Sequence, residues 1–525
     1  MRFFNTAGPV RPDKHYTIPV LSRFNLDEVL SLIEQEKYFV LHAPRQTGKT
    51  SGLLALMEYL NQQGRHYCLY VNVEMGQAAR EEVQQAMEAI LNEMAIRAES
   101  FLKDPWPDQH WRSILEKSGA HGGVNAFLHK WCVHLDKPLV LFIDEIDALV
   151  GDTLISVLRQ LRAGYDSRPG AFPQSVILCG VRDVRDYRIH SSREKSIITG
   201  GSAFNIKATS LRLGNFKQAE VQQLFGQHTK ETEQAFEPEA LEQVWDYTSG
   251  QPWLVNALGY ETCFEMKANR DRQRTITAEM VVEARENLIL RRDTHLDQLV
   301  DKLQEERVRR VIEPILGGAV QPNQVPQDDL WYVRDLGLIT TEGHAQIANR
   351  IYQEVIPREL TYTTQLVITH ESAWYLRDNG TLNIKKLLLA FQEFFREHSE
   401  HWVERFQYKE AGPQLLLQAF LQRVVNTGGR IEREYGLGRM RTDLLVLWQH
   451  PQGLQKIVIE LKLLHKSLEH TLKAGLEQTV QYMDRCGSEE GYLMLFDRTP
   501  DKSWDEKIFQ KTVRHHNREL LVLGM

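Results

Sequence analysis

Apolar residues in the first half of the chain fall into short continuous runs separated by stretches with other spacings. Helical patterns lie between the first four runs. Strands that alternate with helices are typical of βαβ units in a mostly parallel sheet, where ligands bind at the carboxyl ends of the strands. We therefore expect an α/β fold with a mostly parallel sheet over residues 1–214. The runs predict strands at residues 38–42, 66–73, 138–143, 175–180 and 205–213.

The pattern turns helical after the last of these runs. Apolar positions recur at helical spacing, and Pro252 stands at the first turn of a further helix. We expect a helical lid over residues 215–295. Residues 296–360 combine helices with a short hairpin and resemble a winged helix. Because Asp328 and Asp329 make its presumed recognition helix acidic, a spacer is favoured over a DNA-binding module.

The remaining chain, residues 361–525, has a pattern of its own. Amphipathic helical spacing at residues 384–398 and 411–426 comes first. A glycine pair then leads into a series of strand-like runs with a helical pattern at residues 470–484. The predicted strands lie at residues 430–435, 441–448, 456–462 and 491–497.

A phosphate-binding motif follows the first strand. The loop's N–H groups and the start of the next helix form a cradle for anions. Lys49 can reach the β- and γ-phosphates of a nucleotide, and the Thr50 hydroxyl can ligate Mg²⁺. Alanine replaces the usual first glycine, and an ordinary strand–turn–helix is the alternative interpretation. The nucleotide-binding stretch is Ala43, Pro44, Arg45, Gln46, Thr47, Gly48, Lys49, Thr50 and Ser51.

Carboxylates end the third predicted strand. Asp144 would hold Mg²⁺ through water, and Glu145 would be the base that polarises the attacking water. A solvated acidic turn is the alternative. After the fourth strand, Arg182 could sense the γ-phosphate. Candidate arginine fingers, from the same chain or from a neighbouring subunit, are Arg182, Arg185, Arg188 and Arg193, each of which could instead be a surface arginine.

Composition narrows the class of protein. Of the 525 residues, 42% are hydrophobic and 25% are charged, as in ordinary globular chains. The net charge of −7 excludes a global basic excess, so any nucleic-acid surface must be local. Five scattered cysteines without metal-binding spacing indicate reduced thiols and a cytoplasmic location. No apolar run is long enough for a membrane span, and the N-terminus has no signal-peptide pattern.

Taken in order, these motifs resemble the AAA-type ATPases of the STAND and origin-recognition kind. The resemblance rests on the phosphate loop, on Asp144-Glu145, on residues 180–188 and on the turn at residues 250–252. It implies an ATPase core over about residues 1–290, with that turn opening a lid helix near the nucleotide.

A second set of polar residues lies in the last part of the chain. Residues 460 and 462 are two apart on a predicted strand, so their side chains share one face. Carboxylates of Asp443 and Glu460 on adjacent strands can share Mg²⁺ or Mn²⁺, and Lys462 can orient or deprotonate the attacking water. A solvent-facing Glu–Lys pair is the alternative.

This set resembles the PD-(D/E)XK nuclease superfamily. The resemblance implies a restriction-endonuclease-like α/β/α domain, with Gln478 on the helix after the lysine strand and Glu410 as a further metal-associated acid. Thr442 stands where the family often has proline. The residues expected to be catalytic in the whole chain are Glu145, Asp443, Glu460, Lys462, Gln478 and Glu410, and those expected to hold metal are Thr50, Asp144, Asp443 and Glu460.

The sequence therefore predicts an ATP- and Mg²⁺-dependent ATPase joined to a metal-dependent nuclease. Its partner would be nucleic acid, with DNA as the expected class, and family analogy points to prokaryotic defence or mobile elements. A neighbour's arginine finger would require a homo-oligomer. Two alternatives stay open: a nucleotide-dependent switch whose C-terminal domain binds a partner without cutting, and an ATPase that remodels a protein–nucleic-acid complex. The sequence does not decide between DNA and RNA, or whether ATP licenses or restrains cutting.

Overall fold

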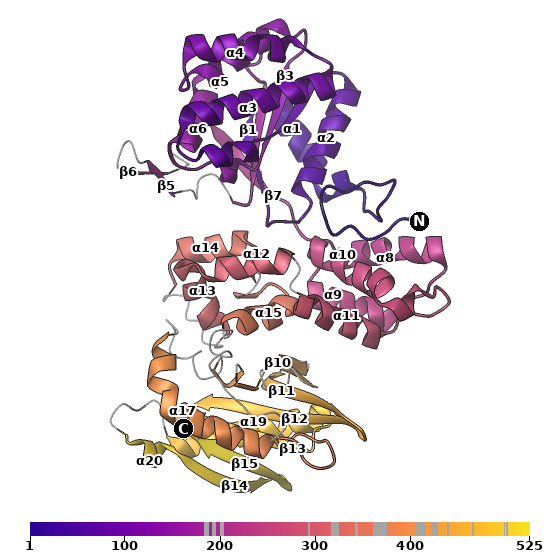
Figure 1. Ribbon diagram of the computed structural model, residues 1–525, viewed down its shortest axis with the longest axis vertical. Coiled ribbons are helices and arrows are strands. Elements are labelled where there is room, and N and C mark those ends of the chain that lie inside the picture. Colours follow the sequence, from indigo (N-terminus) through magenta and orange to yellow (C-terminus); the bar gives the residue numbers. More distant parts are fainter. Residues whose placement is uncertain are drawn as a thin grey trace. The chain divides into compact units, whose positions relative to one another are not determined.

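Two compact units make up the chain in its computed structural model (Figure 1). The first unit contains residues 1–293 and 330–339, and the second contains residues 294–329 and 340–525. The four-part division expected from the sequence stays a prediction. The structure describes residues 1–182, 188–191, 196–199, 204–291, 294–316, 325–341, 345–360, 375–405, 416–418, 420–421, 429–437, 440–464, 467–497, 499 and 502–525.

A five-stranded parallel sheet forms the centre of the first unit, with strand order β2-β3-β4-β1-β7. The α/β fold class and the parallel sheet expected from the sequence are confirmed. A separate two-stranded antiparallel sheet pairs β5 with β6. The strands are β1 (Tyr38–His42), β2 (Tyr67–Asn72), β3 (Leu139–Asp144), β4 (Ser175–Gly180), β5 (Arg188–Ser191), β6 (Ser196–Thr199) and β7 (Lys207–Arg212).

Helices cover both faces of this sheet because its central strands are apolar on both sides. Phe39 and Leu41 pack in one core with residues of α1 and α2, while Tyr38 and Val40 pack in another with residues of α3, α5 and α6. Alternate residues of β1 thus enter opposite cores. The helices are α1 (Leu26–Glu34), α2 (Lys49–Gln63), α3 (Val83–Arg97), α4 (Trp106–Ser118), α5 (Gly123–His134) and α6 (Gly151–Ala163).

Helices follow the sheet, as the sequence predicts. The N-terminal residues pack against them: Phe4 contacts the Phe225 ring, and the Tyr16 hydroxyl is 3.1 Å from Nδ1 of the buried His228. The segment that precedes α1 therefore belongs to the core of the helical part. These helices are α8 (Gln218–Thr232), α9 (Pro238–Thr248), α10 (Pro252–Tyr260) and α11 (Ala278–Arg291).

The next section contains helices and a short two-stranded sheet. Its elements are α12 (Thr294–Leu303), α13 (Glu306–Leu316), α14 (Gln327–Asp335), β8 (Ile339–Thr340), β9 (Gln346–Ile347) and α15 (Arg350–Leu360). Most of α14 lies in residues 330–339, which pack with the first unit. The helices before β8 agree with the predicted pattern, helix α15 after β9 was not expected, and the winged-helix assignment stays a prediction.

A mixed six-stranded sheet ends the chain, with strand order β10-β11-β12-β13-β15-β14. Its two central pairs, β12–β13 and β13–β15, are parallel, and the outer pairs are antiparallel. Helix α17 packs on one face and α19 on the other. The elements are α17 (Ile384–Arg405), β10 (Gly429–Leu437), β11 (Met440–His450), β12 (Gly453–Leu463), α19 (Leu468–Cys486), β13 (Glu490–Phe496), α20 (Trp504–Lys507), β14 (Phe509–His515) and β15 (Arg518–Gly524).

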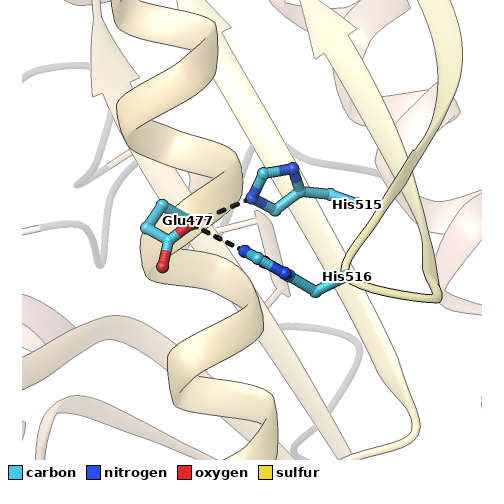
Figure 2. A group of neighbouring side chains, drawn as sticks. All are labelled: Glu477, His515 and His516. Atoms are coloured by element: carbon cyan, nitrogen blue, oxygen red, sulfur yellow. Dashed lines mark hydrogen bonds and ion pairs between the residues drawn. The ribbon is translucent and has the colours of Figure 1, made fainter.

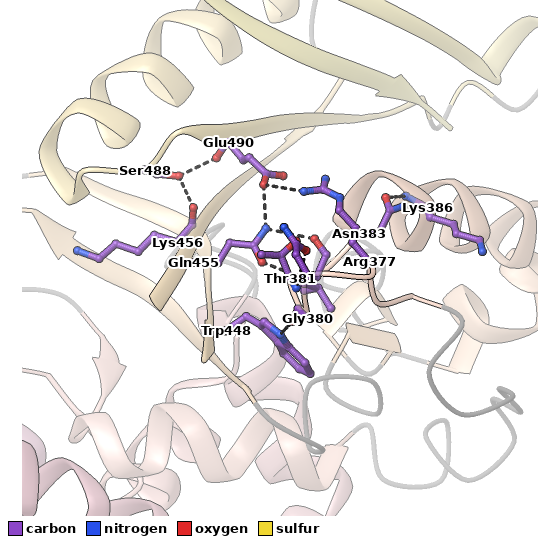
Figure 3. Close-up of polar contacts among 12 residues, drawn as sticks. Arg377, Gly380, Thr381, Asn383, Lys386, Trp448, Gln455, Lys456, Ser488 and Glu490 are labelled. Carbon is purple, nitrogen blue, oxygen red and sulfur yellow. Dashed lines mark hydrogen bonds and ion pairs between the residues drawn. The ribbon is translucent and has the colours of Figure 1, made fainter. Parts of the chain in front are cut away.

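Polar contacts fasten the segment before α17 to this sheet (Figure 3). The Gln455 side chain accepts a hydrogen bond from Leu382 N at 2.8 Å and donates one to Glu490 at 2.8 Å. The Trp448 indole donates to Gly380 O at 2.9 Å. These bonds satisfy polar groups where β11 ends and β12 begins, and they fix the chain just before α17.

None of the helices in the described ranges combines the length and the apolar character needed to span a bilayer.

Candidate nucleotide site

The phosphate loop joins β1 to α2 at the carboxyl edge of the sheet. Gly48 caps α2 with φ of 89°, a left-handed conformation that glycine adopts without steric cost. The Lys49 side chain is buried, and its Nζ donates to the carbonyls of Ala43 and Pro44 at 2.9 and 3.0 Å. The loop therefore curls around the lysine ammonium, which places a positive charge at the helix N-terminus.

Asp144 ends β3 and is fully buried. Its Oδ2 accepts hydrogen bonds from the Thr50 hydroxyl at 2.8 Å and from the Tyr70 hydroxyl at 2.9 Å, and its Oδ1 accepts from Glu145 N at 3.0 Å. Parallel strands bring their carboxyl ends to one edge, so the loop hydroxyl and the strand-end acid meet although they are far apart in the chain. The structure thus joins two residues that the sequence placed in one site.

Glu145 directly follows, in a left-handed conformation with φ of 57°. Such a backbone conformation is uncommon outside glycine. Burial and the neighbouring Asp144 carboxylate raise the pKa of Glu145, while Lys49 and Arg45 oppose that rise. A carboxylate with a raised pKa is a better proton acceptor than an ordinary glutamate.

The other predicted loop residues have different surroundings. The Thr47 hydroxyl donates to Pro44 O at 2.8 Å, and Ser51 Oγ accepts from Val10 N at 3.0 Å. Arg45 and Gln46 are exposed, and Gln46 has a left-handed φ of 57°. Ser51 therefore ties the N-terminal segment to α2.

Arg182 follows β4, and its guanidinium lies over the Tyr332 ring at 4.9 Å. Among the other finger candidates, Arg185 and Arg193 lie outside the described residues, and nothing is described of the Arg188 side chain. The role of these arginines stays a prediction.

Arg23 also belongs to the site, although the sequence analysis did not single it out. Its guanidinium donates to Thr47 O in the phosphate loop and to Gly214 O, at 2.6 Å, where the sheet meets the helical part. It lies 4.8 Å from the Phe216 ring centroid, and burial lowers its pKa to about 10. No spacing pattern marks Arg23, because its partners are backbone carbonyls.

Tyr70 and residues 330–339 were missed as well. A tyrosine near the end of an apolar strand is usually interpreted as a core residue. Here the Tyr70 hydroxyl also donates a hydrogen bond to Asp144. Asp335 Oδ2 lies 3.9 Å from His42 Nδ1, directly before the phosphate loop. A Cβ on Gly337 would come within 2.6 Å of the Pro44 ring, so α14 and the turn after it border the loop closely.

The donor set fits ATP with Mg²⁺. Hydroxyl and carboxylate oxygens of Thr50 and Asp144, 2.8 Å apart, are the hard ligands that Mg²⁺ prefers. Lys49 and the loop's backbone N–H groups would hold the phosphates. The bound cation would neutralise phosphate charge.

In the second unit, the structure brings together two residues of the predicted nuclease set. Lys462 Nζ lies 2.6 Å from Glu460 Oε1, and Glu460 is buried. Leu444 of β11 pairs with Ile459 of β12 in an antiparallel ladder. The next pair along the two strands is Asp443 and Glu460, so the backbone places the two acids opposite each other. Nothing is described of the Asp443 side chain.

Gln478 lies on α19, whose residues share a core with Val458 of β12. Its Oε1 is buried without a hydrogen-bond partner among the described residues. Glu410 lies outside the described residues. The assembly of the full nuclease set therefore stays a prediction.

Solved structures of three similar proteins show how far the likeness extends. A Walker-type ATPase of Pyrococcus abyssi is 17% identical, with a TM-score of 0.45 over 67% of this chain and 99% of that one. The RuvB Holliday junction branch migration motor of Thermotoga maritima is 15% identical, with a TM-score of 0.33 over 63% and 94%. Cdc6p from Pyrobaculum aerophilum is 15% identical, with a TM-score of 0.35 over 72% and 93%.

No curated protein matches the chain. A family model described as an AAA-like domain matches residues 27–356, a range that contains the phosphate loop, Asp144, Glu145 and the helices after the sheet. With this match and the nucleotide-site geometry, the chain belongs to the AAA-like domain family and has the P-loop fold of an ATPase.

Proposed function

We propose that the first unit binds ATP with Mg²⁺ and hydrolyses it to ADP and phosphate. The single observation that carries this proposal is the 2.8 Å bond between Thr50 in the phosphate loop and Asp144 at the end of β3. This bond joins the two halves of a nucleotide–cation site, and the family match supports the same activity.

In the proposed reaction, Lys49 and the loop's N–H groups hold the phosphates, and Thr50 and Asp144 orient the cation. Glu145 accepts a proton from water while the water oxygen bonds to the γ-phosphorus. The bond between the γ-phosphorus and the β,γ-bridging oxygen breaks, and ADP leaves. The raised pKa of Glu145 favours this proton transfer. Arg182 is proposed to sense the γ-phosphate.

The test compares phosphate release and ATP binding in four proteins. Lys49→Ala should lose ATP binding, whereas Glu145→Gln should bind ATP and release phosphate at least about 100-fold more slowly, the usual effect of losing a general base. Glu58→Gln, on the exposed side of α2, is the matched control. Wild-type turnover by Glu145→Gln would refute the assigned role, and no ATP binding by the wild type would refute the site.

The second unit is proposed to cleave nucleic acid, with DNA as the substrate class, using Mg²⁺ or Mn²⁺ at Asp443 and Glu460. The observation in favour is the buried Glu460 beside Lys462 at 2.6 Å, opposite the Asp443 position in the sheet. Water would attack the phosphorus, Lys462 would assist its deprotonation, and the ester oxygen would leave with a proton.

Cleavage of plasmid and single-stranded DNA, with and without ATP, tests this activity. Asp443→Ala and Glu460→Ala should abolish cleavage and leave ATP binding intact, while Glu469→Ala, at the exposed start of α19, should cleave normally. Undiminished cleavage by Asp443→Ala would refute the nuclease assignment. An ATP-dependent partner complex without cleavage would instead support the switch in which the C-terminal domain only binds.

A further inference from the structure

Glu477, His515 and His516 form a compact cluster in the second unit, and none of the three belongs to the proposed nuclease set (Figure 2). Glu477 lies on α19, His515 ends β14, and His516 begins the turn into β15. The Nε2 atoms of His515 and His516 lie 3.0 and 3.1 Å from Oε2 of Glu477. One potential ligand atom from each residue lies within 4.8 Å of the others.

The hairpin turn explains how two consecutive histidines reach the same carboxylate. Neighbouring residues on a strand normally point to opposite faces. Here His516 and Asn517 have left-handed φ values of 44° and 61°, between the paired residues His515 and Arg518. A two-residue turn of this kind reverses the chain at once, and it redirects the second imidazole toward α19 (Figure 2).

Neighbouring side chains hold the carboxylate in place. Gln481, one turn further along α19, donates to Oε1 of Glu477 at 2.9 Å, which leaves Oε2 toward the histidines. Arg518 binds Asp484 at 2.8 Å and fixes the start of β15 to the same helix. Outer contacts of this kind commonly orient metal ligands.

The chemistry of the set indicates the class of ligand. Two imidazoles and one carboxylate suit Zn²⁺ and its neighbours Co²⁺ and Ni²⁺, whereas Mg²⁺ prefers oxygen ligands alone. The Glu477 and His516 side chains are 47% and 62% exposed, so a cation can enter from solvent.

We propose that Glu477, His515 and His516 bind a divalent transition-metal cation, with Zn²⁺ as the best match. The ion would replace the two hydrogen bonds by three coordination bonds and leave a fourth position for water or an external ligand. It would also join α19 to the β14–β15 hairpin, two parts of the chain separated in sequence by β13 and α20.

Zinc titration of the full-length protein tests the proposal. Protein freed of metal with a chelator is titrated with ZnCl₂ by calorimetry, without nucleotide, and Co²⁺ is used as a spectroscopic probe of tetrahedral coordination. We expect a Zn²⁺-binding event in the wild type whose affinity Glu477→Gln or His515→Ala lowers by at least about tenfold, since each removes one of three ligands. His470→Ala, on the exposed start of α19, is the matched control and should bind as the wild type does.

A second variant distinguishes the loss of a metal ligand from the loss of the folded β14–β15 hairpin. His516→Gln changes an exposed turn residue and should leave the thermal unfolding profile unchanged. It should also lower the affinity for Zn²⁺ and remove the visible absorption bands of bound Co²⁺. Equal Zn²⁺ affinity in wild type, Glu477→Gln and His516→Gln would overturn the site. A wild type that binds no Zn²⁺ would overturn it as well.

Discussion

Replacing Arg23 should weaken ATP binding although no nucleotide motif contains this residue. Its guanidinium bonds to Thr47 O in the phosphate loop and to Gly214 O at the start of the helical part. A hydrogen bond from a charged donor contributes about 1.5–3 kcal/mol. Arg23→Ala removes both bonds, so the loop is free to leave the conformation that binds phosphate.

The expected magnitude follows from this loss of preorganisation. We take the cost of returning the loop to its binding conformation as about 1.5 kcal/mol, the low end of the range for the lost bond to Thr47. A cost of this size raises the Kd for ATP roughly tenfold. Arg23→Lys keeps a positive charge but has one ammonium in place of the planar fork that spans two carbonyls. It should therefore give an intermediate Kd.

The assay is a titration with a fluorescent ATP analogue in the presence of Mg²⁺. Arg65→Ala removes an exposed arginine that pairs only weakly with Glu34, at 3.4 Å, and is the matched control. A Kd for Arg23→Ala within twofold of the wild type, in a protein with an unchanged unfolding profile, would refute the reasoning. So would a normal Kd accompanied by slow turnover, since that result would place the effect of Arg23 in the helical part.

Three further predictions concern the same unit. Glu145 must be ionised to accept a proton in the proposed reaction, and its pKa is raised. As the pH is lowered, kcat should therefore begin to fall at a higher pH than the pKa of an ordinary glutamate would give. A decline in kcat centred at the pKa of an ordinary glutamate would contradict this. Tyr70→Phe removes a bond to Asp144 and should destabilise the unit by about 1–2 kcal/mol, seen by calorimetry as a lower Tm; an unchanged Tm would count against that bond. Gly250→Ala should destabilise by more than about 2 kcal/mol, because φ is 72° and the new Cβ would lie 2.0 Å from Phe216 O, and a soluble protein with wild-type unfolding would disprove the constraint.

Much of the geometry of the candidate nucleotide site was predictable because its parts follow local rules. The apolar runs predict β1 and β3, the parallel arrangement predicts that their carboxyl ends share an edge, and Thr50 and Asp144 meet there. The mixed sheet of the second unit was predicted less completely. Residues 509–524 form the hairpin β14–β15, and the sequence analysis assigned no strands there.

The missed residues act through tertiary contacts that leave no periodic signal. Arg23 meets two backbone carbonyls, which any sequence provides. The N-terminal residues Phe4 and Tyr16 precede the sheet but pack with helices more than 200 positions later, as the 212-residue separation of Tyr16 and His228 illustrates. Local pattern predicts elements, whereas these pairings depend on how the elements come together.

The division of the chain has a consequence for its synthesis. The first unit does not end at residue 293, because residues 330–339 return to it and border the phosphate loop through Gly337. Domains generally fold as units while the chain emerges from the ribosome, N-terminal part first. The nucleotide unit can therefore complete its structure only after residue 339 has emerged, when α12 and α13 of the second unit are already made. A fragment cut at residue 293 would lack the segment that borders Pro44 of the phosphate loop.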